Sequence, residues 1–331
     1  MNKIHSKSPC CNAVVYRFGS RRRQCRACKK TWRIRKKKRG RKPLRIQPNP
    51  HATVILKRQS IANRARKSCL SFGQIRLRHE RNLQQILKHA SPPTIPVGEL
   101  IAIIDGWHFY LKGQKHVIYL ILLRSVTDNL AVITEPVIFS GQERVGQWKQ
   151  AFERIPTETR KRIKAVISDG ITGIEKFAVE QCWVIQRCHF HLIATLQKLR
   201  GKCPNTTNRT LREEIYQTVL AILIVADNTE ARKLLDDLRQ LLDKPDCPYW
   251  FRRRVRGFFE QVEHFRSYLN HPELNLPITS NSAECVFQSV TEMFRLTRGF
   301  RSLKSFELWL RVQLRLKGTV KCNGKNFNQY Y

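Results

Sequence analysis

Two aspartates follow short apolar runs that have the composition of buried strands. Ile101–Gly106 reads IAIIDG and carries Asp105 after four apolar residues, and Lys164–Gly170, KAVISDG, carries Asp169 in the same way. A short continuous apolar run bounded by a turn signal is typical of a strand buried on both faces. We therefore predict that both carboxylates lie at the carboxyl ends of strands, where an acid can bind a metal ion.

A third carboxylate, Glu284, belongs to a predicted helix capped by Asn281. Glu284 is three residues beyond Asn281, the spacing of a capping box, and this role alone could account for it. The helix has a buried stripe (Ala283, Phe287, Val290 and Phe294) and a polar stripe (Glu284, Gln288, Thr291 and Arg295). Because Glu284 lies on the polar stripe, it faces away from the contact of the helix with the core and is available for chemistry.

Three converging acids suit phosphodiester cleavage with two metal ions. Two Mg²⁺ ions about 4 Å apart align the nucleophile and relieve charge on the leaving oxygen. Mg²⁺ prefers carboxylate oxygens, so Asp105 would bridge both ions, with Asp169 on one ion and Glu284 on the other. The alternative for each aspartate is a cap on the helix that follows its strand.

The elements that must position these acids alternate in a recognisable order. We predict strands at Leu100–Ile104, His116–Ser125 and Leu130–Phe139, a helix at Gln142–Ile155, the strand before Asp169, a helix at Gly173–Glu180 and a strand at Cys182–Arg187. The order β-β-β-α-β-α-β predicts an α/β fold with a ribonuclease H-like core, a mixed five-stranded sheet with flanking helices. Its first and fourth strands are neighbours, which would place Asp105 beside Asp169.

The rest of the chain divides into segments of distinct composition. We expect a zinc-ribbon-like segment (1–35), a basic linker (36–50), a helical, helix-turn-helix-like DNA-binding region (51–90), the first part of the core (97–200), an all-helical insertion (201–276), the last part of the core with the Glu284 helix and a C-terminal helix (277–318), and a basic tail (319–331). A plain helical spacer is the alternative for residues 51–90.

Charge indicates a polyanionic partner. The chain has 62 Lys and Arg against 25 Asp and Glu, a net charge of +37, and no acid precedes Glu80. Salt bridges within that segment are therefore excluded, and phosphates are the expected counter-charges, with a basic disordered tail as the alternative. The residues expected to contact DNA are Arg21, Arg22, Arg23, Arg35, Lys36, Lys37, Lys38, Arg39, Arg41, Lys42, Arg295, Arg298 and Arg301.

Four of the eleven cysteines lie in the first 28 residues. Cys25 and Cys28 form a C-x-x-C knuckle, a good half of a zinc site, whereas Cys10 and Cys11 are adjacent. Either Cys10 and Cys11 both bind zinc in an unusual turn, or Cys11 does so with His5 as the fourth ligand. Reduced cysteines in a flexible arm are the alternative.

The compartment follows from the same composition. An odd cysteine count in a long chain does not fit a secreted disulfide scaffold, and the N-terminus has no apolar signal segment. The longest apolar run, Val117–Leu123, is too short to span a bilayer. We expect a soluble cytoplasmic protein, associated with the nucleoid.

Several of these motifs, taken in order, resemble those of bacterial insertion-sequence transposases of the Mutator-like type. They are IIDGWH with Asp105, ISDGITG with Asp169, RCHFH with Cys188 and His191, TSNSAECVF with Glu284, and the RGF segment that leads into the last helix. The likeness covers roughly residues 95–315. It implies a DDE triad of Asp105, Asp169 and Glu284 on a ribonuclease H-like fold, with a helical insertion before the glutamate.

The resemblance also implies an activity. This is Mg²⁺-dependent hydrolysis at transposon ends, followed by attack of the freed 3′ hydroxyl on another DNA strand. It implies that Cys188 and His191 support the active site; His189 and His191 could touch the scissile DNA, or be packed, neutral side chains. Double-stranded DNA, as transposon ends and target, is the expected partner of a homodimer. A structure-specific nuclease and a non-catalytic DNA-binding regulator are the rival functions.

Overall fold

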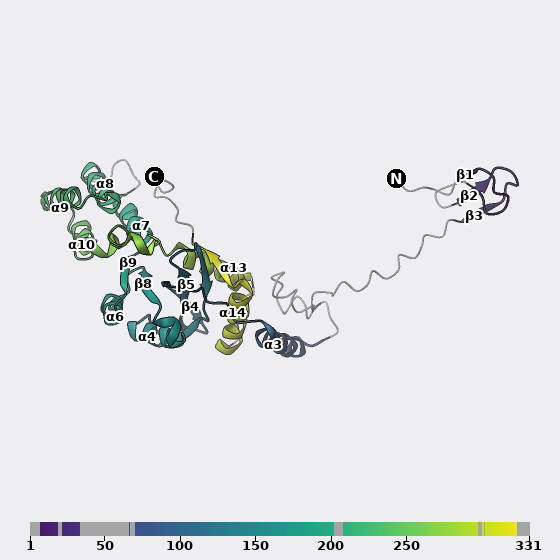
Figure 1. Ribbon diagram of the computed structural model, residues 1–331, viewed down its shortest axis with the longest axis horizontal. Coiled ribbons are helices and arrows are strands. Elements are labelled where there is room, and N and C mark those ends of the chain that lie inside the picture. Colours follow the sequence, from purple (N-terminus) through teal and green to yellow (C-terminus); the bar gives the residue numbers. More distant parts are fainter. Residues whose placement is uncertain are drawn as a thin grey trace. The chain divides into compact units, whose positions relative to one another are not determined.

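The computed structural model divides the chain into two units, Met1–Thr53 and Val54–Tyr331, which are described separately (Figure 1). The residues that it describes are 7–18, 22–33, 66, 70–201, 208–296, 300 and 302–322. The expectations for His5, Arg21, Arg35, Lys36, Lys37, Lys38, Arg39, Arg41, Lys42, Arg298 and Arg301 lie outside the described residues, as do residues 51–65 and 67–69 of the predicted helix-turn-helix region.

The smaller unit is a three-stranded antiparallel sheet. Its strands are β1 (Val15–Arg17), β2 (Arg22–Cys25) and β3 (Thr31–Arg33), in the order β1-β2-β3. The turn between β2 and β3 contains Cys28, and Lys29 in this turn has a positive φ of 60°. The sheet lies within the segment expected to be zinc-ribbon-like, and Cys25 is the last residue of β2.

The larger unit contains one mixed sheet of seven strands. They are β4 (Leu100–Leu111), β5 (Gln114–Ser125), β6 (Leu130–Ile133), β7 (Val137–Ser140), β8 (Ile163–Ser168), β9 (Val184–Arg187) and β10 (Thr319–Lys321). The strand order is β10-β6-β5-β4-β8-β9, and β7 also pairs with β5. β4 and β5 form an antiparallel hairpin, whereas β8 runs parallel to β4 and β9 parallel to β8. The predicted adjacency of the first and fourth strands is confirmed.

Three predictions about these strands were wrong. The run Leu130–Phe139 is two strands, because Pro136 between them has no N–H to give to a ladder. β4 does not end at Ile104 but continues to Leu111, because the β5 partner extends equally far and a tight turn closes the hairpin at Lys112 and Gly113, both with positive φ. The expected basic tail begins with β10, which pairs with β6.

Helices cover both faces of the sheet, which explains the uninterrupted apolar runs of its central strands (Figure 1). One face packs against α13 (Asn281–Leu296) and α14 (Leu303–Lys317), and the other against α4 (Val145–Glu153) and α6 (Ile174–Glu180). α5 (Thr157–Arg160) is a single turn before β8. The helix α3 (Phe72–His89) packs on α14 and begins with a capping box.

A group of helices with its own core lies between β9 and α13. They are α7 (His189–Arg200), α8 (Arg209–Ile224), α9 (Asn228–Asp243), α10 (Tyr249–Phe259), α11 (Val262–Phe265), α12 (Ser267–Asn270) and the 3-10 turn Pro272–Leu274. The described part of the predicted insertion at 201–276 thus contains helices and no strand, and α7 joins its core through Ile193 and Leu196. Among the described helices, none has the length and apolar character required to cross a membrane.

Candidate active site and cysteine cluster

Asp105 on β4 and Asp169, directly after β8, lie at matching positions relative to two adjacent parallel strands. The last residue pair between β4 and β8 is Ile103 with Ile167, and each aspartate is two residues further along its own strand direction. Neighbouring strands are about 4.8 Å apart, so the fold places side by side two acids that are far apart in sequence. Asp105 is therefore not at a strand end as predicted, but at the point where β4 continues beyond its neighbour β8.

Glu284 reaches the same region from α13. Its helix packs against β4, and Glu284 Oε1 lies 3.5 Å from Nε2 of His191 on α7. The prediction that Asn281 is the N-cap was wrong by one residue, because Asn281 is the first helical residue. The carbonyl oxygen of the preceding residue, Ser280, accepts from the N–H groups of Ala283 and Glu284. The Glu284 side chain is directed toward His191.

The three acids interact through their charges. Burial raises the pKa of Asp105 to about 8, and the charges of Asp169 and Glu284 add to this effect, whereas His191 opposes it. Burial also raises the pKa of Glu284, with a further contribution from Asp169. Burial and neighbouring negative charges disfavour the ionised form of these carboxyl groups, and a nearby cation stabilises that form.

The cluster offers carboxylate oxygens, which are the donor type of hard divalent cations. Within the described chain, Asp169 Oδ1 and Glu284 Oε1 are buried and make no hydrogen bond. The ligand atoms of the three acids do not all lie within 4.8 Å of one another, although a single shared ion would favour such a spacing. Two ions about 4 Å apart require a wider set of ligands, and carboxylate oxygens are the donors that Mg²⁺ selects.

Cys188 and His191 support the cluster from the start of α7. Cys188 is buried, and its Sγ accepts from the backbone N–H of Ser280 at 3.3 Å, which ties the start of α7 to the start of α13. A hydrogen bond with Cys188 raises the pKa of His191 to about 9, and the charges of Cys188, Asp169 and Glu284 act in the same direction. His191 is thus held as a cation facing the acids.

His189 is a packing residue, as one of the two alternatives proposed. It is fully buried, and its Nε2 lies 2.6 Å from the carbonyl oxygen of Phe265. Burial lowers its pKa to about 4, so the ring is neutral. Its ring also lies edge-on to Tyr268, with centroids 5.5 Å apart. This enclosure favours the alternative of a packed, neutral side chain for His189 over contact with scissile DNA.

Arg187 holds the turn that carries Asp169, a role not predicted from the sequence. Its Nη2 donates to the Asp169 carbonyl oxygen at 3.2 Å and its Nη1 to Glu175 Oε1 at 3.1 Å, while the guanidinium lies over the Phe265 ring. Gly170 allows this arrangement, because it has a φ of +112° and any Cβ there would overlap the guanidinium. The sequence has no local pattern that indicates a contact between residues 18 positions apart.

Gly170→Ala is therefore expected to impair both folding and any activity of the site. The backbone conformation is one that L side chains rarely adopt, at a cost of about 1–3 kcal/mol, and Arg187 must leave its buried position. We expect thermal unfolding several degrees lower and a loss of activity larger than the loss of folded protein. Gly146→Ala on α4 is the control, since a Cβ there meets nothing within 4 Å. Equal melting temperatures for the two variants would contradict the role of Gly170.

A second pair of side chains near Asp169 was also missed. Glu143 Oε1 accepts from Trp148 Nε1 at 2.9 Å, and Glu143 Oε2 lies 3.3 Å from Nε2 of His108. Burial raises the pKa of Glu143, and the charge of Asp169 contributes. The sequence feature that could have indicated this contact is Gly106, directly after Asp105, because a glycine within a strand often marks the close approach of another group.

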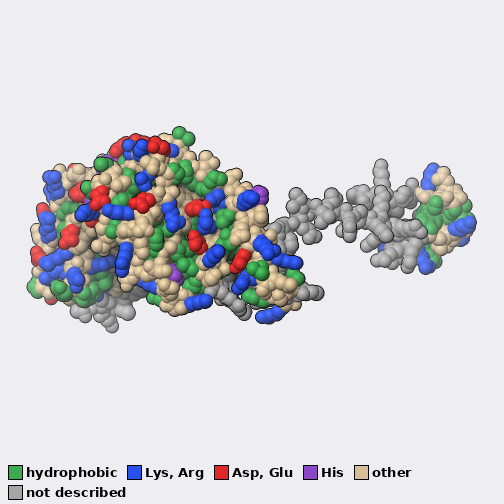
Figure 2. Space-filling model, turned by 90° about the horizontal axis from the view of Figure 1, so that it is seen from below, with side chains coloured by type: hydrophobic (Ala, Val, Ile, Leu, Met, Phe, Trp, Pro, Cys, Tyr) green, Lys and Arg blue, Asp and Glu red, His purple; other side chains and the backbone are tan. Residues whose placement is uncertain are grey.

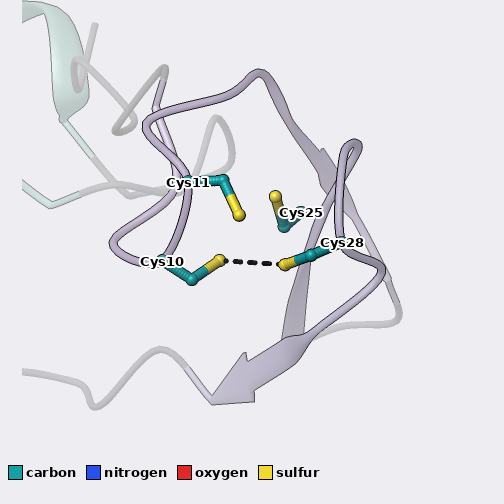
Figure 3. A group of neighbouring side chains, drawn as sticks. All are labelled: Cys10, Cys11, Cys25 and Cys28. Carbon is teal, nitrogen blue, oxygen red and sulfur yellow. Dashed lines mark hydrogen bonds between the residues drawn. The ribbon is translucent and has the colours of Figure 1, made fainter.

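The cysteines of the smaller unit converge on one point (Figure 3). The sulfurs of Cys10, Cys11, Cys25 and Cys28 all lie within 4.8 Å of one another, and the Cys10 and Cys28 sulfurs are 3.3 Å apart. Tetrahedral zinc with Zn–S bonds of about 2.3 Å places its sulfurs about 3.8 Å apart. The four thiols could thus bind one zinc ion, which favours the alternative in which both adjacent cysteines are ligands.

Ser8 explains how adjacent cysteines can both face the same point. Its Oγ accepts from the backbone N–H groups of Ala13 and Cys11, at 3.1 and 3.4 Å, and so closes the turn that contains the pair. The Cys25 thiol lies 3.2 Å from the same oxygen, and this hydrogen bond is the main cause that lowers the pKa of Cys25 to about 6. Thiolates are the form in which cysteine binds metal.

Of the residues expected to contact DNA, the structure describes Arg22, Arg23 and Arg295. Arg22 and Arg23 lie on β2, and Arg295 is exposed near the end of α13. On the larger unit, Lys and Arg side chains are spread over the face shown in Figure 2, with acids between them. On this face the positive charge is therefore not concentrated in one stripe.

No protein-family model matches the chain, and no curated protein matches it.

Proposed function

We propose that this protein is a DNA transposase of the DDE type. The observation that carries the proposal is the convergence of three acids: Asp105 on β4, Asp169 directly after the adjacent parallel strand β8, and Glu284 on α13. Three carboxylates in mutual electrostatic contact, with buried oxygens that make no hydrogen bond within the described chain, are suited to hold two Mg²⁺ ions. The motif order supports the same assignment.

The sheet supports a ribonuclease H-like core. The first three strands of its central part are antiparallel neighbours in the order β6-β5-β4, and β8 and β9 follow as parallel strands on the other side of β4. The helical insertion occupies the interval between the second aspartate and the glutamate, where the motif order requires it. β7 and β10 are additions at the periphery of this arrangement.

In this proposal each acid has a separate task. Asp105, the most buried acid, faces both of its partners and would bridge two ions, with Asp169 and Glu284 each completing one. When bound, the two Mg²⁺ ions lower the barrier by aligning the attacking oxygen and relieving charge on the leaving oxygen. Arg187 keeps Asp169 in place through its backbone, and His191 balances the charge of the acids beside Glu284.

DNA supplies the counter-charge that the chain lacks. The net charge of +37 is concentrated before Glu80, where 25 Lys and Arg occur without any acid. In this proposal the cysteine cluster stabilises the N-terminal ribbon, and the ribbon binds transposon ends. Arg22 and Arg23 on β2 contact the DNA. Because transposition joins two ends, the active form in this proposal is a homodimer on DNA, associated with the nucleoid.

The test uses the genomic DNA on both sides of the coding region. We expect inverted repeats there, and purified protein with Mg²⁺ should nick labelled repeat ends and join their 3′ hydroxyls to a second duplex. Cleavage without joining would identify the structure-specific nuclease, and binding without cleavage the non-catalytic regulator. The same repeat with scrambled sequence is the control DNA.

Salt is expected to weaken DNA binding steeply. For a protein that neutralises six to ten phosphates, affinity falls by about 10³–10⁵ between 50 and 200 mM salt, because bound counterions are released. The double variant Arg22→Gln and Arg23→Gln should lower the slope of log Kd against log salt by about two, one for each lost phosphate contact. Fluorescence anisotropy measures both quantities. A slope near zero in the wild type would contradict binding through phosphates.

A further inference from the structure

Three exposed apolar side chains lie in one row on the smaller unit. Val14, Tyr16 and Phe18 are 57%, 41% and 48% exposed. They alternate with Val15 and Arg17 along β1 and its two flanking residues, so they point to the same face of the sheet. Figure 2 shows hydrophobic side chains gathered on the smaller unit, with Lys and Arg at their edge. Exposed apolar side chains that are grouped in this way indicate a binding surface.

Positive side chains border this row. Phe18 donates its N–H to the carbonyl oxygen of Arg22, and the strand register places the exposed Arg22 beside Phe18 on the same face. Lys29 is exposed, and its Nζ lies 6.0 Å from the centroid of the Tyr16 ring. Each aromatic ring of the row thus has a cationic side chain next to it.

The charge of the smaller unit determines which partner fits this face. Residues 1–53 contain no Asp or Glu, so two copies of the face would repel each other, and phosphate is the complementary group. Phosphates alone require only the cations, whereas an exposed aromatic ring suits the flat surface of a base. Nucleic acid provides both groups in one molecule.

The spacing of the row favours an unpaired strand over a duplex. Alternate residues of a strand are about 7 Å apart, whereas successive bases along one strand of a duplex are about 3.4 Å apart. The neighbouring bases of a duplex also cover both surfaces of each base. A base can therefore lie on an exposed ring only when its strand is unpaired and opened out, as in other single strands bound on aromatic side chains.

We propose that the row of Val14, Tyr16 and Phe18 binds unpaired DNA, with bases stacked on the two aromatic rings and phosphates beside Arg22 and Lys29. The inference rests on the proposed function, because the strand breaks of that reaction supply free ends whose nucleotides can separate from their partners. It gives the ribbon a second form of DNA to bind, in addition to the duplex of the transposon ends.

The experiment compares two DNA probes, an oligothymidylate of about twelve nucleotides and a blunt duplex of the same length. Fluorescence anisotropy at fixed salt gives the affinity of the full-length protein purified with zinc. The double variant Tyr16→Ser and Phe18→Ser should bind the single strand at least tenfold more weakly, since each lost stack reduces affinity by about 5–150-fold. Its affinity for the duplex should change by less than about threefold. The zinc content should stay the same, because both rings are exposed.

Two conservative changes separate stacking from simple apolar contact. The double variant Tyr16→Leu and Phe18→Leu keeps the apolar surface but removes the aromatic rings, so it should bind the single strand as weakly as the serine pair. Tyr16→Trp should retain the affinity. The control is Val179→Ser, since Val179 is 70% exposed on α6, in the larger unit, and should not contribute. Retention of affinity by the leucine pair would overturn the inference and indicate an apolar protein partner.

Photo-crosslinking locates the contact directly. A single strand that carries 5-iododeoxyuridine should crosslink to Tyr16 or Phe18, as identified by mass spectrometry of the peptides. Crosslinks only at other residues, a wild type that does not bind the single strand, or single-strand binding by the serine pair within about threefold of wild type would each overturn this inference.

The proposed function fails by a different result. Wild-type protein that binds oligothymidylate through this row but neither cuts nor joins repeat DNA would overturn the proposed function and leave the binding of unpaired DNA established. Wild-type protein that cuts and joins repeat DNA, with no loss of single-strand affinity in the serine pair, would overturn this inference alone.

Discussion

Replacing any one of the three acids by its amide is expected to abolish cleavage and strand transfer. Asp105→Asn, Asp169→Asn and Glu284→Gln each keep the shape of the side chain and remove the charge that binds Mg²⁺. We expect a loss of about 10³-fold or more, equivalent to about 4 kcal/mol of transition-state stabilisation. DNA affinity should be nearly unchanged, because it depends on basic residues elsewhere in the chain.

The structure sharpens this prediction for Asp105. Its ionised form is disfavoured by burial and by the charges of Asp169 and Glu284. Asp105→Asn removes a buried acid and should leave the metal-free protein at least as stable to heat, while the stabilisation by added Mg²⁺ disappears. Asp236→Asn is the control, since Asp236 is exposed on α9 and pairs only with Arg239 in the described contacts. Near-normal cleavage by any of the three variants would remove that residue from the metal site.

Removal of zinc is expected to unfold the smaller unit. Structural zinc contributes roughly 10–16 kcal/mol of apparent binding free energy in small cysteine-rich modules, which a three-stranded sheet cannot supply from its own core. A strong chelator, or Cys25→Ser, should release one zinc ion per chain and expose residues 7–33 to protease. Thermal unfolding of the larger unit should not change, because its core is separate.

The same measurement separates the two ligand sets that the sequence left open. The sulfur of Cys10 is 3.3 Å from that of Cys28, so Cys10→Ser should lose zinc as completely as Cys11→Ser. His5→Ala should retain it. Cys182→Ser serves as the control, since Cys182 is an exposed thiol of the larger unit. Metal analysis that found full zinc content in Cys10→Ser would show that the fourth ligand lies elsewhere.

Much of the fold could be predicted because its signals are local. Apolar runs such as Ile101–Ile104 and Val117–Leu123 marked the central strands, and a stripe at helical spacing marked α13. The boundaries were less certain, since the ends of elements depend on partners: β4 is longer than its apolar run because β5 pairs with it along its whole length. The pairing of Thr319–Lys321 with β6 had no local signal, because an edge strand of three residues has no pattern of its own.

The sequence by itself determined which groups are available: three acids after or within apolar segments, four clustered cysteines, and a basic N-terminal region without acids. Only the tertiary structure decided which of them meet. Side-by-side pairing of β4 and β8, the Arg187 contact with Asp169, and the approach of Glu143 to Gly106 all join segments distant in sequence. Such contacts follow from the burial of apolar surface by the whole chain, and no short stretch of residues encodes them.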